Sequence, residues 1–221
     1  MEKEAKIVIG VGIVIVVLFG GLIFYAAKQK TPPPSTGPVS QDVIVRSDSH
    51  GTPNIPARVT ISEFGDYQCP ACGVAHGAVK ELLKEYAGKI TFVFRNFPLD
   101  SHPNGRPAAK AAEAAALQGK FWEMHDMIYE KQNEWSNSKT VSTIFIGYAQ
   151  SLKLNIDQFT KDMESDKVKD VIARDTADGI TAHVQATPTF FINTEPFVGV
   201  PSKEFKDILD KALSAPSEPA K

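Results

Sequence analysis

The sequence Val59-Thr60-Ile61-Ser62-Glu63-Phe64-Gly65-Asp66-Tyr67-Gln68-Cys69-Pro70-Ala71-Cys72 contains the only two cysteines of this 221-residue chain. Residues 59–64 are mostly β-branched or apolar, which is typical of a buried strand. After Cys72 the apolar residues follow helical spacing. The sequence therefore predicts that the two cysteines lie where a strand turns into a helix.

Three explanations fit two cysteines that are separated by two residues. A disulfide across so short a loop removes little chain entropy, so a purely structural bond is a weak explanation. A structural zinc site needs about four ligands, and only His76 is near. Thiol–disulfide exchange needs an attacking sulfur and a second sulfur that resolves the mixed disulfide. The spacing favours this redox chemistry.

The two sulfurs are expected to differ in reactivity. Pro70 suits the first position of a helix, because the N–H that it lacks would have no partner there. Cys69 would then lie at a helix N-terminus, where free N–H groups and partial positive charge favour the thiolate and lower the pKa. We expect Cys69 to be the attacking sulfur and Cys72 to resolve.

A long apolar run lies near the N-terminus. Residues 7–27 are uncharged, and as a helix they would span roughly 31 Å, about one hydrocarbon core. The run is longer than the apolar part of a cleaved signal peptide. It predicts a transmembrane anchor behind a cytoplasmic tail of residues 1–6, although cleavage after Ala27 remains an alternative.

Chemistry suggests the orientation of this anchor, because two basic residues lie on each side of it and charge does not decide. A dithiol oxidant is held reduced in a cytosol but can cycle in an oxidising compartment. We therefore expect a single-pass protein of the cell membrane whose catalytic domain is extracytoplasmic, in the periplasm or at the cell exterior.

The rest of the chain divides by composition. Residues 28–56 are rich in Pro, Ser and Thr and predict a linker, in which residues 43–45 form a short apolar patch that could add an edge strand. Residues 57–214 have the size of one domain, and residues 215–221 are expected to be a flexible tail. The net charge is −2, so no basic surface points to nucleic acid.

Within the domain the elements predict an α/β fold. Residues 90–95 form a second strand, so that strand, helix and strand make a unit with a parallel pair. A helical insertion follows at about 107–184. Residues 187–193 and 197–200 predict an antiparallel hairpin, and residues 202–213 a last amphipathic helix with Ser202 as its N-cap.

This order of elements resembles the DsbA-like branch of the thioredoxin superfamily, a thioredoxin fold with a helical insertion. Four blocks in the family's order carry the resemblance. They are residues 63–72 with the Cys-Pro-Ala-Cys motif, residues 94–99 with His102 and Pro103, residues 112–126, and residues 186–193 with Thr187 and Pro188.

The resemblance implies roles for particular residues. Thr187 and a cis Pro188 would lie against the cysteines and bind an extended peptide through backbone groups, the alternative being an ordinary trans proline. Glu63 would be a buried acid that exchanges protons with the second thiol, unless it points to solvent.

Other residues are expected to tune the thiols. Ala71 stands where strong oxidases of the family have a histidine that can stabilise the thiolate. The absence of this histidine should raise the pKa of Cys69 and make the disulfide a weaker oxidant. His76 lies one helical turn after Cys72 and could influence it. His102 and His125 are interpreted as packing or capping residues.

These inferences predict a membrane-tethered thiol:disulfide oxidoreductase that uses Cys69 and Cys72, without cofactor or metal, to introduce disulfides into secreted or envelope proteins. The family implies unfolded or reduced secreted proteins as partners, and a quinone-linked membrane reoxidant of the DsbB or vitamin K epoxide reductase type. The alternatives are a disulfide reductase or isomerase, and a non-catalytic metal- or peptide-binding module.

Overall fold

The computed structural model describes residues 39–52 and 57–215, and in these residues five strands form one mixed sheet in the order β1-β3-β2-β4-β5. The strands are β1 (His50–Thr52), β2 (Val59–Gly65), β3 (Ile90–Asn96), β4 (Thr189–Ile192) and β5 (Glu195–Val198). Strands β2 and β3 run parallel, and every other neighbouring pair is antiparallel. The predicted parallel pair and the predicted hairpin are both confirmed.

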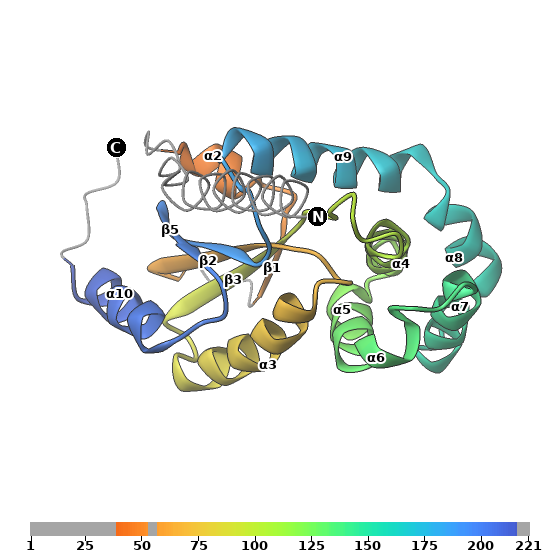
Figure 1. Ribbon diagram of the computed structural model, residues 1–221, viewed down its shortest axis with the longest axis horizontal. Coiled ribbons are helices and arrows are strands. Elements are labelled where there is room, and N and C mark those ends of the chain that lie inside the picture. Colours follow the sequence, from red (N-terminus) through yellow and green to blue (C-terminus); the bar gives the residue numbers. More distant parts are fainter. Residues whose placement is uncertain (1–38, 53–56, 216–221) are drawn as a thin grey trace, which may run out of the picture. The chain divides into compact units, whose positions relative to one another are not determined.

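Helices cover both faces of the sheet (Figure 1). On one face lie α3 (Pro70–Glu85) and α10 (Lys203–Ser214), and on the other lie α2 (Gln41–Ile44) and α9 (Asp166–Thr181). Helix α3 connects β2 to β3, as a crossover between parallel strands requires. The start of α3 therefore lies at the carboxyl end of the central strand β2.

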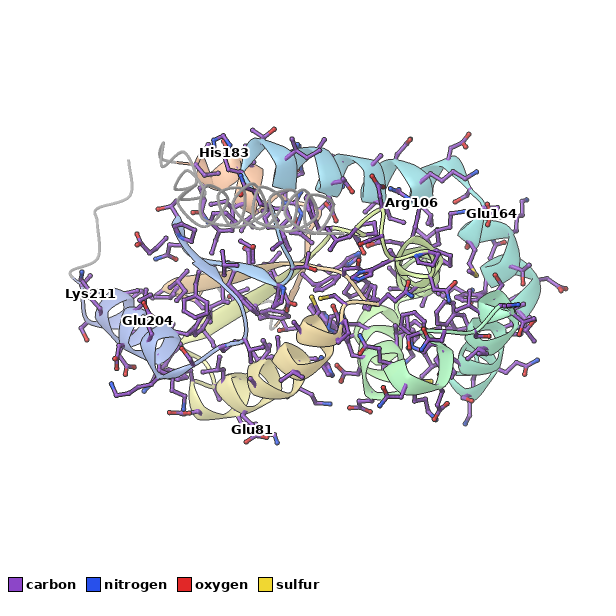
Figure 2. The ribbon with its side chains drawn as sticks, viewed as in Figure 1. Glu81, Arg106, Glu164, His183, Glu204 and Lys211 are labelled. Carbon is purple, nitrogen blue, oxygen red and sulfur yellow. The ribbon has the colours of Figure 1, made fainter. Side chains whose placement is uncertain are left out.

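The predicted helical insertion is confirmed. It contains α4 (Gly105–Ala116), α5 (Phe121–Glu130), α6 (Gln132–Trp135), α7 (Val141–Ser151) and α8 (Ile156–Met163), and α9 leads back to the sheet. Alanines of α4 are almost fully buried, since small side chains let neighbouring helices approach closely. Figure 2 shows the labelled charged side chains, among them Glu81, Glu164 and Lys211, pointing outward from the periphery.

The linker predicted for residues 28–56 is wrong over residues 41–52. Residues 41–44 form α2, so the patch at 43–45 is not an edge strand, and β1 takes that place by pairing with β3. Ile44 is completely buried, in an apolar cluster with Phe64, Phe97 and Phe191. Burial of this side chain holds the segment on the sheet, which a local composition rich in Pro and Ser does not indicate.

Arg95 of β3 fixes α9 and α2 to this face of the sheet. Its guanidinium is fully buried and pairs with Asp175 and Asp178 of α9. The same group donates to the carbonyl oxygens of Val43 and Ile44 at 3.0 and 2.9 Å. A buried arginine with so many partners orders two helices against one strand.

Two further expectations have different outcomes. Ser202 precedes α10, but its side chain makes no capping hydrogen bond, whereas Asn155 and Ser165 do cap α8 and α9. The transmembrane anchor predicted at residues 7–27 and the tail after residue 215 lie outside the described residues. Within the described part, none of the helices has the length and apolarity to cross a membrane.

Candidate functional site

The two cysteines lie at the start of α3, as the sequence predicts. Cys69 occupies the N-cap position with extended backbone, and Pro70 is the first residue of the helix. The Cys69 N–H donates to the carbonyl oxygen of Asp66 at 3.0 Å, which closes the turn between β2 and α3. Two N–H groups of the first helical turn, those of Ala71 and Cys72, bond to the Cys69 sulfur.

Cys69 is the more reactive of the two thiols. Its Sγ lies 3.4 Å from the carbonyl oxygen of Thr187. A hydrogen bond from the Cys72 thiol, with smaller contributions from Thr187 and the N–H groups of Ala71 and Cys72, outweighs burial and lowers the pKa of Cys69 to about 5. Cys69 is therefore a thiolate at neutral pH in the reduced protein. Ala71 contributes to this pKa through its backbone N–H, and the weaker oxidant expected from the absence of histidine at this position stays a prediction.

Cys72 has the opposite character. It is completely buried, and burial together with the Cys69 sulfur and Glu63 raises the pKa of its thiol well above the ordinary value. It stays protonated at neutral pH unless a base takes its proton. The asymmetry between Cys69 and Cys72 is what an attacking sulfur and a resolving sulfur need.

Glu63 lies in the middle of β2 on the face that α3 covers, and it is only 2% exposed. Burial, followed by the nearby Cys69 sulfur, raises the pKa of its carboxyl to about 8. Its Oε1 atom has no hydrogen-bond partner in the described structure. The alternative in which Glu63 points to solvent is wrong, and the carboxyl can exchange a proton near neutral pH.

Thr187 and Pro188 face the cysteines, joined by a cis peptide bond. The Thr187 carbonyl oxygen, which contacts Cys69, belongs to the segment just before β4. Cys69 and Thr187 are each less than a tenth exposed, and both cysteines are buried free thiols in this structure. The structure thus brings together Glu63, Cys69, Cys72, Thr187 and Pro188.

Asp66, which was not predicted as a site residue, organises the loop before Cys69. Its buried carboxylate accepts from the N–H groups of Gln68 and Leu99 at 2.8 and 2.9 Å and contacts His102 Nδ1 at 2.6 Å. The bond to Gln68 lies within the loop between β2 and α3, and the contacts with Leu99 and His102 join this loop to the segment after β3. The signal in the sequence was the presence of Asp66 and His102 in two of the resemblance blocks.

Gln132 is a second residue that the sequence did not reveal. Its side-chain amide donates to the carbonyl oxygens of Tyr67 and Cys69 at 2.7 and 2.9 Å. Gln68 extends the same connection, since its amide donates to the Ser136 carbonyl oxygen at 2.7 Å. The helical insertion thus holds the redox loop directly, and no local pattern around Gln132 indicates it.

His76 lies away from the position predicted for a tuning residue. Its ring packs between α3 and α5, stacked on Tyr129 with centroids 5.1 Å apart and edge-on to His125 at 5.3 Å. Its Nε2 lies 3.5 Å from Asp126 Oδ1. No hydrogen bond joins His76 to either thiol in the described residues, so any influence on Cys72 is indirect.

The comparisons with known proteins agree with this fold and site. The profile of the family described as Thioredoxin matches residues 49–211. The chain belongs to this family. Its structural neighbours include proteins described as a thioredoxin-like oxidoreductase and as a DsbA thiol-disulfide exchange protein.

Two solved structures illustrate the likeness. A thioredoxin-like oxidoreductase from Silicibacter pomeroyi has 25% identity and a TM-score of 0.68, covering 80% of this chain and 99% of that one. The thiol-disulfide exchange protein alpha-DsbA2 from Wolbachia pipientis has 21% identity and a TM-score of 0.68, covering 77% of this chain and 90% of that one.

The curated relatives have a different name. Na(+)/H(+) antiporter NhaA 1 of Mycolicibacterium vanbaalenii is 33% identical over 197 residues, covering 87% of this chain and 31% of that protein. The chain thus spans less than a third of the length of the curated relatives that it matches.

Proposed function

We propose that this protein is a membrane-tethered thiol:disulfide oxidoreductase that donates its Cys69–Cys72 disulfide to reduced proteins outside the cytoplasm. The observation that carries the proposal is the opposite perturbation of the two thiols, with the pKa of Cys69 lowered to about 5 and that of Cys72 raised. A low pKa for the attacking sulfur stabilises the reduced enzyme and so makes its disulfide oxidising.

The reaction has two exchange steps. A substrate thiolate attacks Cys69 Sγ, a mixed disulfide forms, and the bond between Cys69 and Cys72 breaks. The second thiolate of the substrate then attacks the substrate sulfur of the mixed disulfide and expels Cys69 as a thiolate. The substrate loses two electrons and gains a disulfide, and the enzyme is left as a dithiol.

Glu63 donates a proton to the Cys72 sulfur and takes it back. When Cys72 leaves as a thiolate in the first step, its raised pKa means that it takes up a proton. The carboxyl of Glu63, with a pKa of about 8, is protonated at neutral pH and can supply one. On reoxidation the carboxylate takes the proton back, which regenerates the thiolate that closes the disulfide.

Substrate binding is expected at the Thr187–Pro188 segment. Backbone groups before β4 face Cys69 and are suited to pair with an extended peptide, which recognises unfolded chains without selecting a sequence. The reoxidant would be a quinone-linked membrane protein of the DsbB or vitamin K epoxide reductase type. Anchoring by residues 7–27 would let the two partners meet in the membrane plane. The relatives named as antiporters are much longer proteins, and we propose no ion transport for this chain.

The reduction potential of the full chain tests the direction of electron flow. The chain, in detergent, is equilibrated with glutathione buffers, and the fraction of reduced Cys69 is measured by alkylation. A potential above roughly −180 mV is expected for a disulfide donor, and a value below roughly −250 mV would overturn the oxidase in favour of a reductase.

The location is tested separately by expressing the full chain and separating membranes from soluble protein. The chain should remain with membranes after an alkaline wash, and a membrane-impermeant thiol reagent should label Cys69 in intact cells. Release by the wash, or protection from the reagent until the cells are opened, would contradict the tether or the orientation respectively.

A further inference from the structure

We propose that His76, His125 and Asp126 form a binding site for a divalent transition-metal ion, with zinc as the ion that the ligands fit best. The site lies between α3 and α5, behind the redox helix, and it uses neither cysteine. It is independent of the function proposed above.

The three side chains converge at one point. One ligand atom from each residue lies within 4.8 Å of the other two, the only such group of three among the described residues. His76 Nε2 and Asp126 Oδ1 are already 3.5 Å apart. Zinc bonds of about 2.0–2.2 Å at tetrahedral angles place neighbouring ligand atoms about 3.5 Å apart. The bound of 4.8 Å on the ligand separations exceeds this distance, so an ion would draw the wider-spaced ligand atoms closer together.

The His76 ring nitrogen that faces the site lacks a hydrogen-bond partner. His76 is 7% exposed, and its buried Nε2 makes no hydrogen bond in the described structure. An unsatisfied buried nitrogen is costly, and coordination to an ion would satisfy it.

A neighbouring tyrosine orients the second imidazole. The Tyr67 hydroxyl lies 3.0 Å from His125 Nδ1. In the tautomer in which Nδ1 donates to the Tyr67 oxygen, the other ring nitrogen carries the lone pair that an ion requires. Such an outer partner commonly fixes the tautomer of a metal-binding histidine.

The charges around the site favour a cation. Asp126 and Glu130 are negative, and Lys80 joins them at 3.2 and 2.7 Å, which leaves a net charge of −1. Lys80 contacts the Oδ2 atom of Asp126 and leaves Oδ1 facing His76. The lysine can thus keep its bonds while the other carboxylate oxygen binds the ion.

An entry route reaches the carboxylate. A surface pocket of about 380 Å³ is lined by Lys80, Trp122 and Asp126 among other residues. The pocket reaches Asp126 but neither histidine, so an ion would pass this carboxylate to reach the two rings. Two imidazoles and one carboxylate are ligands typical of zinc. A bound ion would tie α3 to α5 one helical turn beyond Cys72.

The test is zinc titration of the oxidised full chain by calorimetry, after treatment with a chelator. Oxidation removes the thiols as competing ligands. We expect one zinc ion per chain and a higher melting temperature with zinc. Cobalt added in place of zinc should give a visible spectrum of nitrogen and oxygen ligands without a thiolate charge-transfer band.

Matched variants assign the site. His76→Gln and Asp126→Asn should each weaken zinc binding at least tenfold. His183→Gln and Glu81→Gln remove the same chemical groups from exposed positions, His183 just after the end of α9 and Glu81 on α3 (Figure 2), and they should leave binding unchanged. If His76→Gln does not fold, Asp126→Asn decides, because its side chain is 40% exposed. Failure of the oxidised wild type to bind zinc, or unchanged binding by Asp126→Asn, would overturn the proposal.

Discussion

Gln132 donates from its side-chain amide to the carbonyl oxygen of Cys69 at 2.9 Å. The donor belongs to the helical insertion and the acceptor to the redox motif, 63 residues earlier in the chain. The insertion therefore contributes to the active loop directly and does more than cover one end of the sheet.

Replacing Gln132 with alanine should loosen this loop. Two part-buried carbonyl oxygens lose their donor. A fully buried unsatisfied group costs about 1–3 kcal/mol, so partial burial places the expected loss of stability near the lower end, about 2 kcal/mol for the two together, with slower disulfide exchange. Urea unfolding and exchange with a model disulfide measure both. Gln118 also bonds the backbone of another segment, since its side-chain amide donates to the Asn155 carbonyl oxygen and accepts from the Asn155 N–H at an exposed position, and Gln118→Ala is the control. Equal exchange rates in the two variants would exclude the role of Gln132.

The reactivity of Cys69 should depend on pH with a midpoint near 5. Its pKa is about 5, so the rate of alkylation in the reduced protein should rise through that value and level off above it, while Cys72 stays unreactive. Mass spectrometry of the alkylated peptides separates the two cysteines. A midpoint above pH 8 would mean that neither the Cys72 thiol nor the helix start stabilises the thiolate.

The same pKa predicts the stability of the reduced form. A folded-state pKa below the unfolded value of about 9 contributes stability that is complete above pH 9 and is lost as the pH falls through about 5. The reduced protein should therefore lose more stability than the oxidised protein between pH 7 and pH 4. Melting curves of both forms at several pH values measure the difference, and parallel curves would contradict it.

Glu63→Gln should stabilise the protein at alkaline pH. The folded-state pKa of Glu63 is about 8 and its ordinary value is 4.5, so wild-type stability falls as the pH rises from 4.5 to 8, by up to about 1.4 kcal/mol per pH unit. Because glutamine cannot ionise, the variant does not lose this stability as the pH rises. Glu204→Gln, on the outer surface of α10 (Figure 2), is the control.

The same Glu63→Gln variant should slow the steps that move the proton of Cys72, by a factor on the order of 10². Stopped-flow measurement of reduction and reoxidation gives these rates. Wild-type rates together with an altered pH dependence of stability would mean that burial raises the pKa of Glu63 but that Glu63 does not transfer the proton of Cys72.

Arg95→Leu should destabilise the fold strongly. Asp175 and Asp178 would remain buried without this cation, and breaking a buried ion pair costs about 3–5 kcal/mol. Arg174→Leu is the control, since Arg174 pairs with the exposed Asp48 and such pairs contribute about 1 kcal/mol or less. Similar unfolding midpoints for the two variants would show that the buried pair is dispensable.

The sequence by itself determined the order of the strands and helices from β2 to α10 and the position of Cys69 and Cys72 at the start of α3. These features follow from local patterns: β-branched runs, helical spacing and Pro70 at the first helical position. The resemblance blocks also indicated Thr187, Pro188 and the burial of Glu63, because short motifs in a fixed order specify a shared fold.

Only the tertiary structure decided which distant groups complete the site. Asp66 and Gln132 make hydrogen bonds to backbone atoms of distant segments. The buried Ile44 side chain packs a segment with the composition of a linker against the sheet. His76 turns toward α5 and not toward the thiols. Local sequence encodes the spacing of residues along one element, whereas these contacts depend on how separate elements pack, and packing is set by the whole core.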